Sequence, residues 1–178
     1  MKKCLIVVDM QNDFISGALG SEDAQEIVPH VVRKVKEYLQ RGEDIMFTLD
    51  THGEDYLQTQ EGINLPVKHC IKGTPGHEIC EEIKAVCDPA QYPCYEKGTF
   101  GSRELALDLS ARDYDFIELV GLCTDICVIS NAMLLKAFIP EATIVVDAYC
   151  CAGISPESHE NALDAMEMCQ MKIENRDL

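Results

Sequence analysis

Short apolar runs alternate with longer segments of helical periodicity along nearly the whole chain, and this alternation restricts the folds that it can adopt. The apolar runs predict strands over residues 3–9, 44–49, 92–96, 115–120, 142–146 and 171–174. The periodic segments predict helices over residues 23–39, 75–86, 102–111, 128–138 and 155–169. Strands that alternate with helices form a parallel sheet with helices on both faces, so we expect an α/β fold.

Length, charge and cysteine content limit the class of protein. The 178 residues fit one domain, residues 1–178, with a sizeable core. A formal net charge of −16 argues against nucleic acid and anionic membrane surfaces as partners. The apolar run Cys4–Val8 is too short for a signal peptide or a membrane span, so we expect a cytoplasmic protein. Its ten cysteines are then expected to be reduced thiols rather than a disulfide framework.

The segment Gly121–Val128 joins a predicted strand to a predicted helix and carries two cysteines. Thr124 is a candidate N-cap, which would place Cys127 in the first helical turn. The partial positive charge of a helix N-terminus favours a thiolate, so Cys127 is a candidate nucleophile near neutral pH. The alternative is a small, buried, apolar cysteine, which is the common fate of a free cysteine.

Polar residues follow several predicted strands at their carboxyl ends, where parallel sheets bind ligands. Asp9, Asp50, Lys97 and the turn of Cys127 each follow a different strand, so we expect them at one edge of the sheet. A Cys127 thiolate can attack a carbonyl carbon, Asp9 can move the proton, and Lys97 can hold both charges in place. Backbone N–H groups of Cys123 and Cys127 can serve as oxyanion donors. Ordinary turn-forming carboxylates and a solvated lysine are the alternatives.

The long polar stretch of residues 51–74 has no clear periodicity, and loops of this length inside a domain are usually functional. Asp50 and His52 stand two residues apart at the start of the stretch, and the loop can bring Glu61 and His69 back toward them. Two imidazoles and two carboxylates suit Zn²⁺, Mn²⁺ or Fe²⁺. Solvated loop histidines are the alternative interpretation, because the spacing is not a strong zinc signature.

Three motifs together resemble those of the isochorismatase-like cysteine hydrolases, and of nicotinamidases in particular. They are Val7-Val-Asp-Met-Gln-Asn-Asp-Phe14, Lys97-Gly98 and Gly121-x-x-Thr-Asp-x-Cys-Val128. The pair Asp50-x-His52 and the segment from Pro66 to Gly76 are similar to the nicotinamidase metal loop. The resemblance spans nearly the whole chain, with the motifs in the same order.

The resemblance implies a three-layer Rossmann-like fold with a six-stranded parallel sheet. It also implies a catalytic triad of Cys127, Asp9 and Lys97 that hydrolyses an amide and releases ammonia. A cis peptide bond is implied within the nucleophile motif, here between Leu122 and Cys123.

The same resemblance assigns a divalent metal and a substrate pocket. Asp50, His52 and His69 match the metal ligands, and Glu61 matches an additional carboxylate of some members. Zinc is the expected ion, with Mn²⁺ and Fe²⁺ as alternatives, and we expect no organic cofactor. Three further residues are matched to the substrate pocket of the family. They are Phe14 as the aromatic that packs on the substrate ring, Phe100 as a replacement for another aromatic, and Leu65 at the position before the proline of the metal loop.

We therefore predict a cysteine amidohydrolase that acts through a thioester intermediate, with nicotinamide as the substrate and nicotinic acid as the product. Hydrolysis of another small amide or ureido compound is an alternative within the same superfamily. A protein that binds metal or uses thiols without turnover is an alternative of a different class. A small-molecule amide is the expected partner, and we expect a homo-oligomer.

Overall fold

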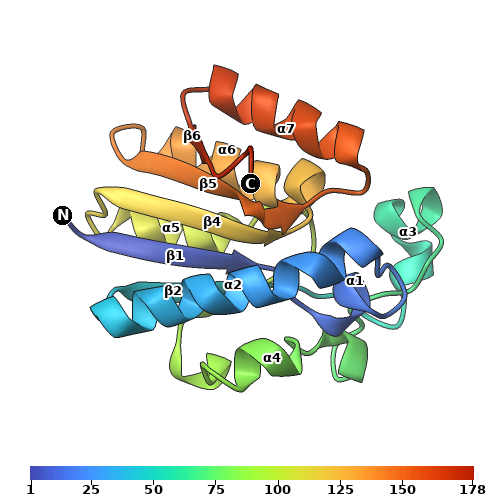
Figure 1. Cartoon of the computed structure of the whole chain (residues 1–178). Coiled ribbons are helices and arrows are strands. Elements are labelled where there is room, and N and C mark those ends of the chain that lie inside the picture. The colour runs from blue at the N-terminus through green and yellow to red at the C-terminus, as the bar shows by residue number, and fades with distance from the viewer.

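The computed structural model describes residues 1–178 as a six-stranded parallel sheet between two layers of helices (Figure 1). The strands lie in the order β3-β2-β1-β4-β5-β6. Their bounds are β1 Lys3–Val8, β2 Asp44–Asp50, β3 Cys94–Lys97, β4 Phe116–Leu122, β5 Thr143–Ala152 and β6 Lys172–Glu174. The predicted α/β class and six-stranded parallel sheet are confirmed.

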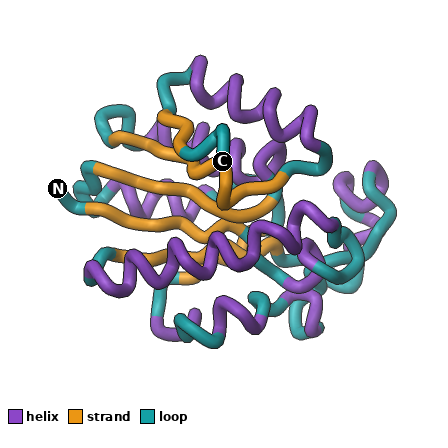
Figure 2. The backbone as a smooth tube through the Cα atoms, in the orientation of Figure 1, coloured by secondary structure: helices purple, strands orange, loops and turns teal.

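The helices divide between the two faces of the sheet, and Figure 2 shows the two layers as purple tubes beside the orange strands. Their bounds are α1 Asn12–Ile15, α2 Glu22–Arg41, α3 Gln60–Asn64, α4 Glu81–Lys84, α5 Arg103–Ser110, α6 Ile129–Phe138 and α7 Pro156–Met168. Helices α2 and α4 pack on one face, and α5, α6 and α7 pack on the other. Helix α3 lies beyond the carboxyl ends of the central strands (Figure 1). None of the helices combines the length and hydropathy that a membrane span requires.

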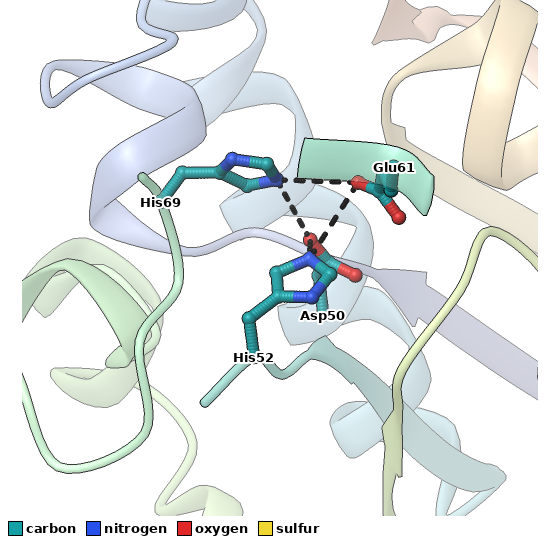
Figure 3. A group of neighbouring side chains, drawn as sticks. All are labelled: Asp50, His52, Glu61 and His69. Carbon is teal, nitrogen blue, oxygen red and sulfur yellow. Dashed lines mark hydrogen bonds and ion pairs between the residues drawn. The ribbon is translucent and has the colours of Figure 1, made fainter. Parts of the chain in front are cut away.

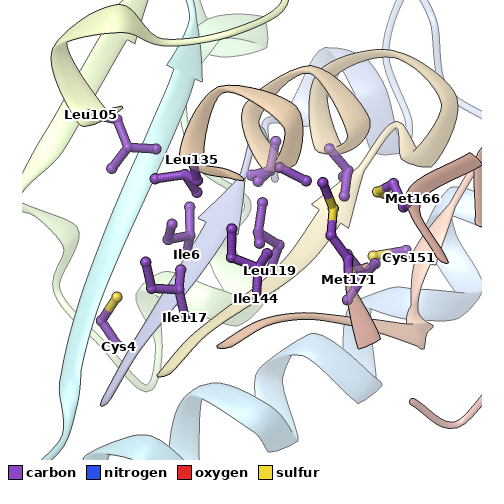
Figure 4. Packing of buried hydrophobic residues seen from close by; sticks show 14 of the residues in the cluster. Cys4, Ile6, Leu105, Ile117, Leu119, Leu135, Ile144, Cys151, Met166 and Met171 are labelled. Atoms are coloured by element: carbon purple, nitrogen blue, oxygen red, sulfur yellow. The ribbon is translucent and has the colours of Figure 1, made fainter. Parts of the chain in front are cut away.

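The alternation of side chains along β1 builds both cores. Leu5 and Val7 point into the cluster under α2, whereas Cys4, Ile6 and Val8 point into the cluster under α5 to α7, part of which Figure 4 shows. A strand buried on both faces explains why β1 reads as one continuous apolar run. The chain leaves β1 and β4 toward opposite faces, and ligands of such sheets bind in the crevice between these carboxyl ends.

The predicted helix over residues 75–86 is wrong. A short 3₁₀ turn, Pro75–His77, and helix α4 are separated by residues 78–80, which are extended. These residues pair with the chain that follows β1: the Asn12 N–H donates to Glu78 O, and the Cys80 N–H donates to Met10 O. The long stretch of residues 51–74 also contains helix α3 and a 3₁₀ turn, Tyr56–Gln58, which the sequence did not indicate.

Strand β5 is longer than predicted, because Asp147 lies inside it rather than at its end. The Asp147 carboxylate is buried, and Lys34 of α2 lies 2.7 Å from it and 2.8 Å from the Glu118 carboxylate. The Tyr38 hydroxyl donates to Glu118 as well, at 2.7 Å. A carboxylate that a cation neutralises can remain within a buried strand, which the sequence pattern alone does not reveal.

Gly121 is the one position on β4 that requires glycine. Its φ is +115°, and a Cβ there would lie 2.1 Å from the Val8 carbonyl oxygen of the paired strand β1. We expect Gly121→Ala to lower the free energy of unfolding by more than about 3 kcal/mol, because the strain and the backbone clash add together. Urea denaturation of the purified protein measures this loss.

Gly42→Ala is the matched control. Gly42 has a φ of +64° at the end of α2, with open space around the position of a Cβ. Gly42→Ala should therefore lower the free energy of unfolding only by the cost of an alanine in the left-handed conformation, about 1 kcal/mol. Equal losses from the two variants would contradict the close approach of β1 and β4.

Candidate active site

Three strands and one helical turn place a nucleophile, a carboxylate and an ammonium group together. Asp9 follows β1, Lys97 ends β3, and Cys127 lies in the turn η4, Thr124–Val128, after β4. The Lys97 Nζ lies 2.6 Å from the Asp9 carboxylate and 3.4 Å from the Cys127 sulfur. All three side chains are buried. The structure therefore brings the three residues of the predicted triad into one cluster.

Burial determines the resting charges of this cluster. Burial and the negative charge of Asp9 raise the pKa of the Cys127 thiol well above its usual range, while Lys97 partly opposes them. Burial also raises the pKa of Asp9, again against the pull of Lys97. The pKa of Lys97 rises despite burial, because Asp9 and Cys127 favour its charged form. Burial thus favours a neutral Cys127 thiol, whereas the neighbouring Lys97 ammonium favours the carboxylate form of Asp9.

Two details of the nucleophile turn differ from the sequence prediction. Thr124 is not an N-cap, because η4 is a wide π-helical turn that begins after Cys123 and has no side-chain cap. The Thr124 hydroxyl instead contacts His159 Nδ1, at 2.7 Å. The expected lowering of the pKa of Cys127 by a helix N-terminus is also wrong, since burial outweighs it. The Leu122–Cys123 peptide bond is cis, as in the motif that the chain resembles.

Asn131, a residue that the sequence analysis missed, joins the nucleophile turn to the loop after β3. Its side-chain amide donates to Cys127 O at 2.8 Å and accepts a hydrogen bond from the Ser102 N–H at 2.9 Å. The same amide donates to Phe100 O at 3.3 Å. Asn131 is buried, so these bonds have no water to compete with them. They hold the Phe100 loop in place relative to the nucleophile.

Four potential metal ligands converge beside the triad (Figure 3). The Asp50 carboxylate lies 2.9 Å from His52 Nε2 and 3.3 Å from His69 Nε2. The Glu61 carboxylate, from α3, lies 3.6 Å and 3.7 Å from the same two nitrogens. Burial would raise the pKa of Asp50, but hydrogen bonds with the two histidines and the nearby Lys97 charge lower it below its usual range.

These spacings and donor types fit a tetrahedral zinc ion. Bonds of about 2.1 Å to nitrogen and oxygen ligands place neighbouring donors about 3.4 Å apart. The separations found between imidazole and carboxylate, 2.9–3.7 Å, lie around that value. The other ring nitrogen of His69 lies 2.8 Å from Val67 O, so the backbone fixes the ring with Nε2 toward the cluster.

The segment after β1 supports both groups of residues. Asp9 has a φ of +47°, which turns the chain away from the sheet. The buried Gln11 side chain then accepts from the Asp50 N–H and donates to Asp50 O, both at 2.8 Å. Asp13 accepts from the Cys70 N–H at 2.8 Å, next to His69. Gln11 and Asp13 belong to the motif that follows β1, but the sequence alone indicates a role for neither.

Tyr56 is a further residue that the sequence did not indicate. It is fully buried, and its ring centroid lies 4.7 Å from that of His52 and 5.0 Å from that of His69. Its hydroxyl donates to Leu65 O at 2.9 Å. Tyr56 therefore limits the rotation of both imidazoles and holds the loop that carries Leu65.

A cavity of about 50 Å³ lies between Cys127 and three of the four potential metal ligands. Asp50, Glu61, His69 and Cys127 provide its polar lining. Its apolar lining consists of Phe14, Leu19, Leu65, Phe100, Cys123 and Ile126. The three residues predicted to contact substrate, Phe14, Leu65 and Phe100, thus face the same cavity. A wider hollow of about 570 Å³ shares Glu61, Leu65, Phe100 and Ile126 with it and leads outward.

Comparison with known proteins identifies the family. The isochorismatase domain model matches residues 3–176. An uncharacterized isochorismatase family protein of Bacillus subtilis, PncA, is 32% identical over 92% of this chain and 93% of its own. The crystal structure of nicotinamidase/pyrazinamidase PncA from Bacillus subtilis superposes with a TM-score of 0.86 at 29% identity, and covers 97% of this chain and 99% of its own.

A second solved structure of a similar protein contains zinc. The pyrazinamidase of Pyrococcus horikoshii in complex with zinc superposes with a TM-score of 0.83 at 28% identity, over 97% of this chain and 98% of its own. The family model and these relatives each extend over nearly the full length of the chain. The chain therefore belongs to the isochorismatase family.

Proposed function

We propose that this protein is a metal-dependent cysteine amidohydrolase that converts nicotinamide into nicotinic acid and ammonia. The chain is an amidohydrolase by its family, and the proposal concerns its substrate, its intermediate and the roles of its residues. One observation carries it: the Lys97 ammonium lies within 3.4 Å of the Cys127 sulfur and 2.6 Å of the Asp9 carboxylate, beside four convergent metal ligands.

The resting charges suit a reaction in which Asp9 acts first as a base. As the Cys127 sulfur attacks the carboxamide carbon, Asp9 accepts the thiol proton, and Lys97 stabilises the charge that develops. Collapse of the tetrahedral intermediate breaks the C–N bond, and Asp9 returns the proton to the leaving ammonia. Water then attacks the thioester while Asp9 accepts its proton. The acid leaves, and the proton returns to the sulfur.

The lining of the cavity suits a flat ring. Phe14, Leu65 and Phe100 offer apolar surface on the way to Cys127. Asp50, His52, Glu61 and His69 would hold the metal, since their donor types and spacings fit zinc. A bound Zn²⁺ that accepted the pyridine nitrogen of the substrate as a fifth ligand would act as a Lewis acid toward it. A pyridine carboxamide can satisfy both ends of such a site at once.

Removal of the nucleophile tests the thioester. Cys127→Ala is expected to lower the rate of ammonia release from nicotinamide by about 10³-fold or more, because no other group can form the intermediate. A glutamate dehydrogenase coupled assay measures the ammonia. Cys169→Ala is the control. It removes an exposed thiol at the end of α7 and should release ammonia at the wild-type rate. Substantial ammonia release by Cys127→Ala would exclude the covalent mechanism. If the wild type were inactive on nicotinamide but active on another amide, only the proposed substrate would be wrong.

Removal of the ammonium group tests the role of Lys97. Lys97→Met keeps much of the side-chain volume but leaves Asp9 and Cys127 without their cation, so we expect kcat to fall by about 10²-fold or more. Lys72→Met, which removes a solvated lysine paired with Glu96, is the control and should keep its activity. Steady-state kinetics measures both, with circular dichroism to establish that each variant is folded. Unchanged kcat in Lys97→Met would remove this residue from the triad.

Zinc binding tests the proposed ligands. His69→Ala removes one of the four convergent donors, and we expect its zinc dissociation constant to rise by about 10²-fold. Competition with a chromophoric chelator at pH 7 measures the constant without any need for turnover. His77→Ala is the matched control, since His77 is a half-buried loop histidine that contacts Thr51 instead of the cluster. Equal affinities of His69→Ala and the wild type would refute the ligand set.

A further inference from the structure

We propose that Asp125 and His159 are positioning residues that hold the Cys127 turn in place by binding η4 to the first turn of α7. The role in turnover rests on the proposed function, whereas the contacts themselves do not. The sequence alone indicates a surface or helix-start position for His159 and no separate role for Asp125. The two residues come from different elements, and together they form a connection that we call the η4–α7 clamp: the contacts of Thr124 and Asp125 with Ile154, Ser158 and His159.

Asp125 makes one half of the η4–α7 clamp. Its carboxylate accepts hydrogen bonds from the Ile154 N–H, at 3.1 Å and 3.2 Å to the two oxygens. The same carboxylate accepts a short hydrogen bond from the Ser158 hydroxyl. Ser158 in turn belongs to the capping box of α7, in which it exchanges hydrogen bonds with Ser155. Asp125 therefore attaches η4 to the capped N-terminus of α7.

Thr124 and His159 make the other half. Thr124 is fully buried, and its hydroxyl lies 2.7 Å from His159 Nδ1. Burial lowers the pKa of His159, which favours the neutral form of the ring. The backbone of His159 also packs closely against Gly153, where an added Cβ would lie 3.0 Å from it. The imidazole thus has little freedom to move away from Thr124.

These contacts matter because η4 has no cap of its own. The turn begins without any side-chain cap, and the two clamped residues stand two and three positions before the nucleophile. Asn131 fixes the carbonyl of Cys127 through a hydrogen bond of 2.8 Å. Without the clamp, the start of η4 would lose its side-chain hydrogen bonds to α7, and the Cys127 sulfur, 3.4 Å from Lys97, would be held less firmly. Displacement of a reacting atom by a fraction of an ångström lowers the rate of chemistry more than it weakens substrate binding.

A pair of substitutions at one position separates positioning from general stability. His159→Leu removes the ring nitrogen, whereas His159→Asn keeps a polar group near the place of Nδ1 that can exchange a hydrogen bond with Thr124. We expect His159→Leu to lower kcat by about tenfold with little change in KM, and His159→Asn to restore most of the rate. His30→Leu is the matched control, because the His30 ring packs on Tyr149 and does not contact η4.

Alkylation of Cys127 by iodoacetamide provides a readout that does not depend on the substrate. Peptide mass spectrometry follows each cysteine separately, and thermal denaturation establishes that the variants are folded. We expect alkylation of Cys127 to slow by about tenfold in His159→Leu, and to recover in His159→Asn, because the sulfur moves away from Lys97. Asp125→Ala should slow it in the same way.

The inference is overturned if His159→Leu retains the wild-type kcat, if its loss lies in KM alone, or if His159→Asn is as slow as His159→Leu. Unchanged or faster alkylation of Cys127 in His159→Leu overturns it too. A wild type that is inactive on nicotinamide would count against the proposed function, and the alkylation rates would still decide whether the η4–α7 clamp positions the sulfur.

Discussion

The whole site depends on one buried ammonium group. Asp9, Asp50 and Cys127 follow three different strands at one edge of the sheet. Burial alone would keep each of these acids neutral, and their ionised forms would repel one another. Lys97 lies within 3.6 Å of all three, and its pKa rises accordingly. A buried charge is tolerated only where opposite charges and hydrogen bonds compensate it. The positions of the strands thus matter chiefly because they bring the partners of Lys97 together.

A single short segment connects the proposed triad to the four potential metal ligands. Within residues 9–14, Asp9 pairs with Lys97, Gln11 holds both backbone groups of Asp50, and Asp13 holds the loop of His69. Phe14 lies 5.6 Å from the His69 ring and lines the cavity between the two groups. All of these residues lie on the one turn that leaves β1, so the conformation of this turn sets the distances between their side chains. A shift of this turn would disturb the nucleophile side and the metal side together.

The periodicity of the sequence predicted the sheet and the helices, because strands buried on both faces leave a clear apolar pattern, as in Lys3–Val8. It also brought the strand-end residues Asp9, Asp50 and Lys97 to one edge, since parallel strands share their carboxyl ends. It failed where a distant partner decides the local structure. Asp147 remains inside a strand because Lys34 neutralises it, and residues 78–80 are extended because the backbone after β1 pairs with them. No local pattern encodes such partners, and the same is true of the contact between Thr124 and His159.

The position of β3 at the edge of the sheet affects the thermal stability of the site. β3 is only four residues long, lies at the edge, and pairs with β2 alone, where Lys97 stands opposite Asp50. Edge elements with few backbone partners open at a lower free energy than the centre of a fold. Each such opening would carry the ammonium away from its three acidic neighbours while the central strands stay paired. We therefore expect the site to be less stable than the fold that surrounds it, so that inactivation on warming begins as fraying of one edge rather than as global unfolding.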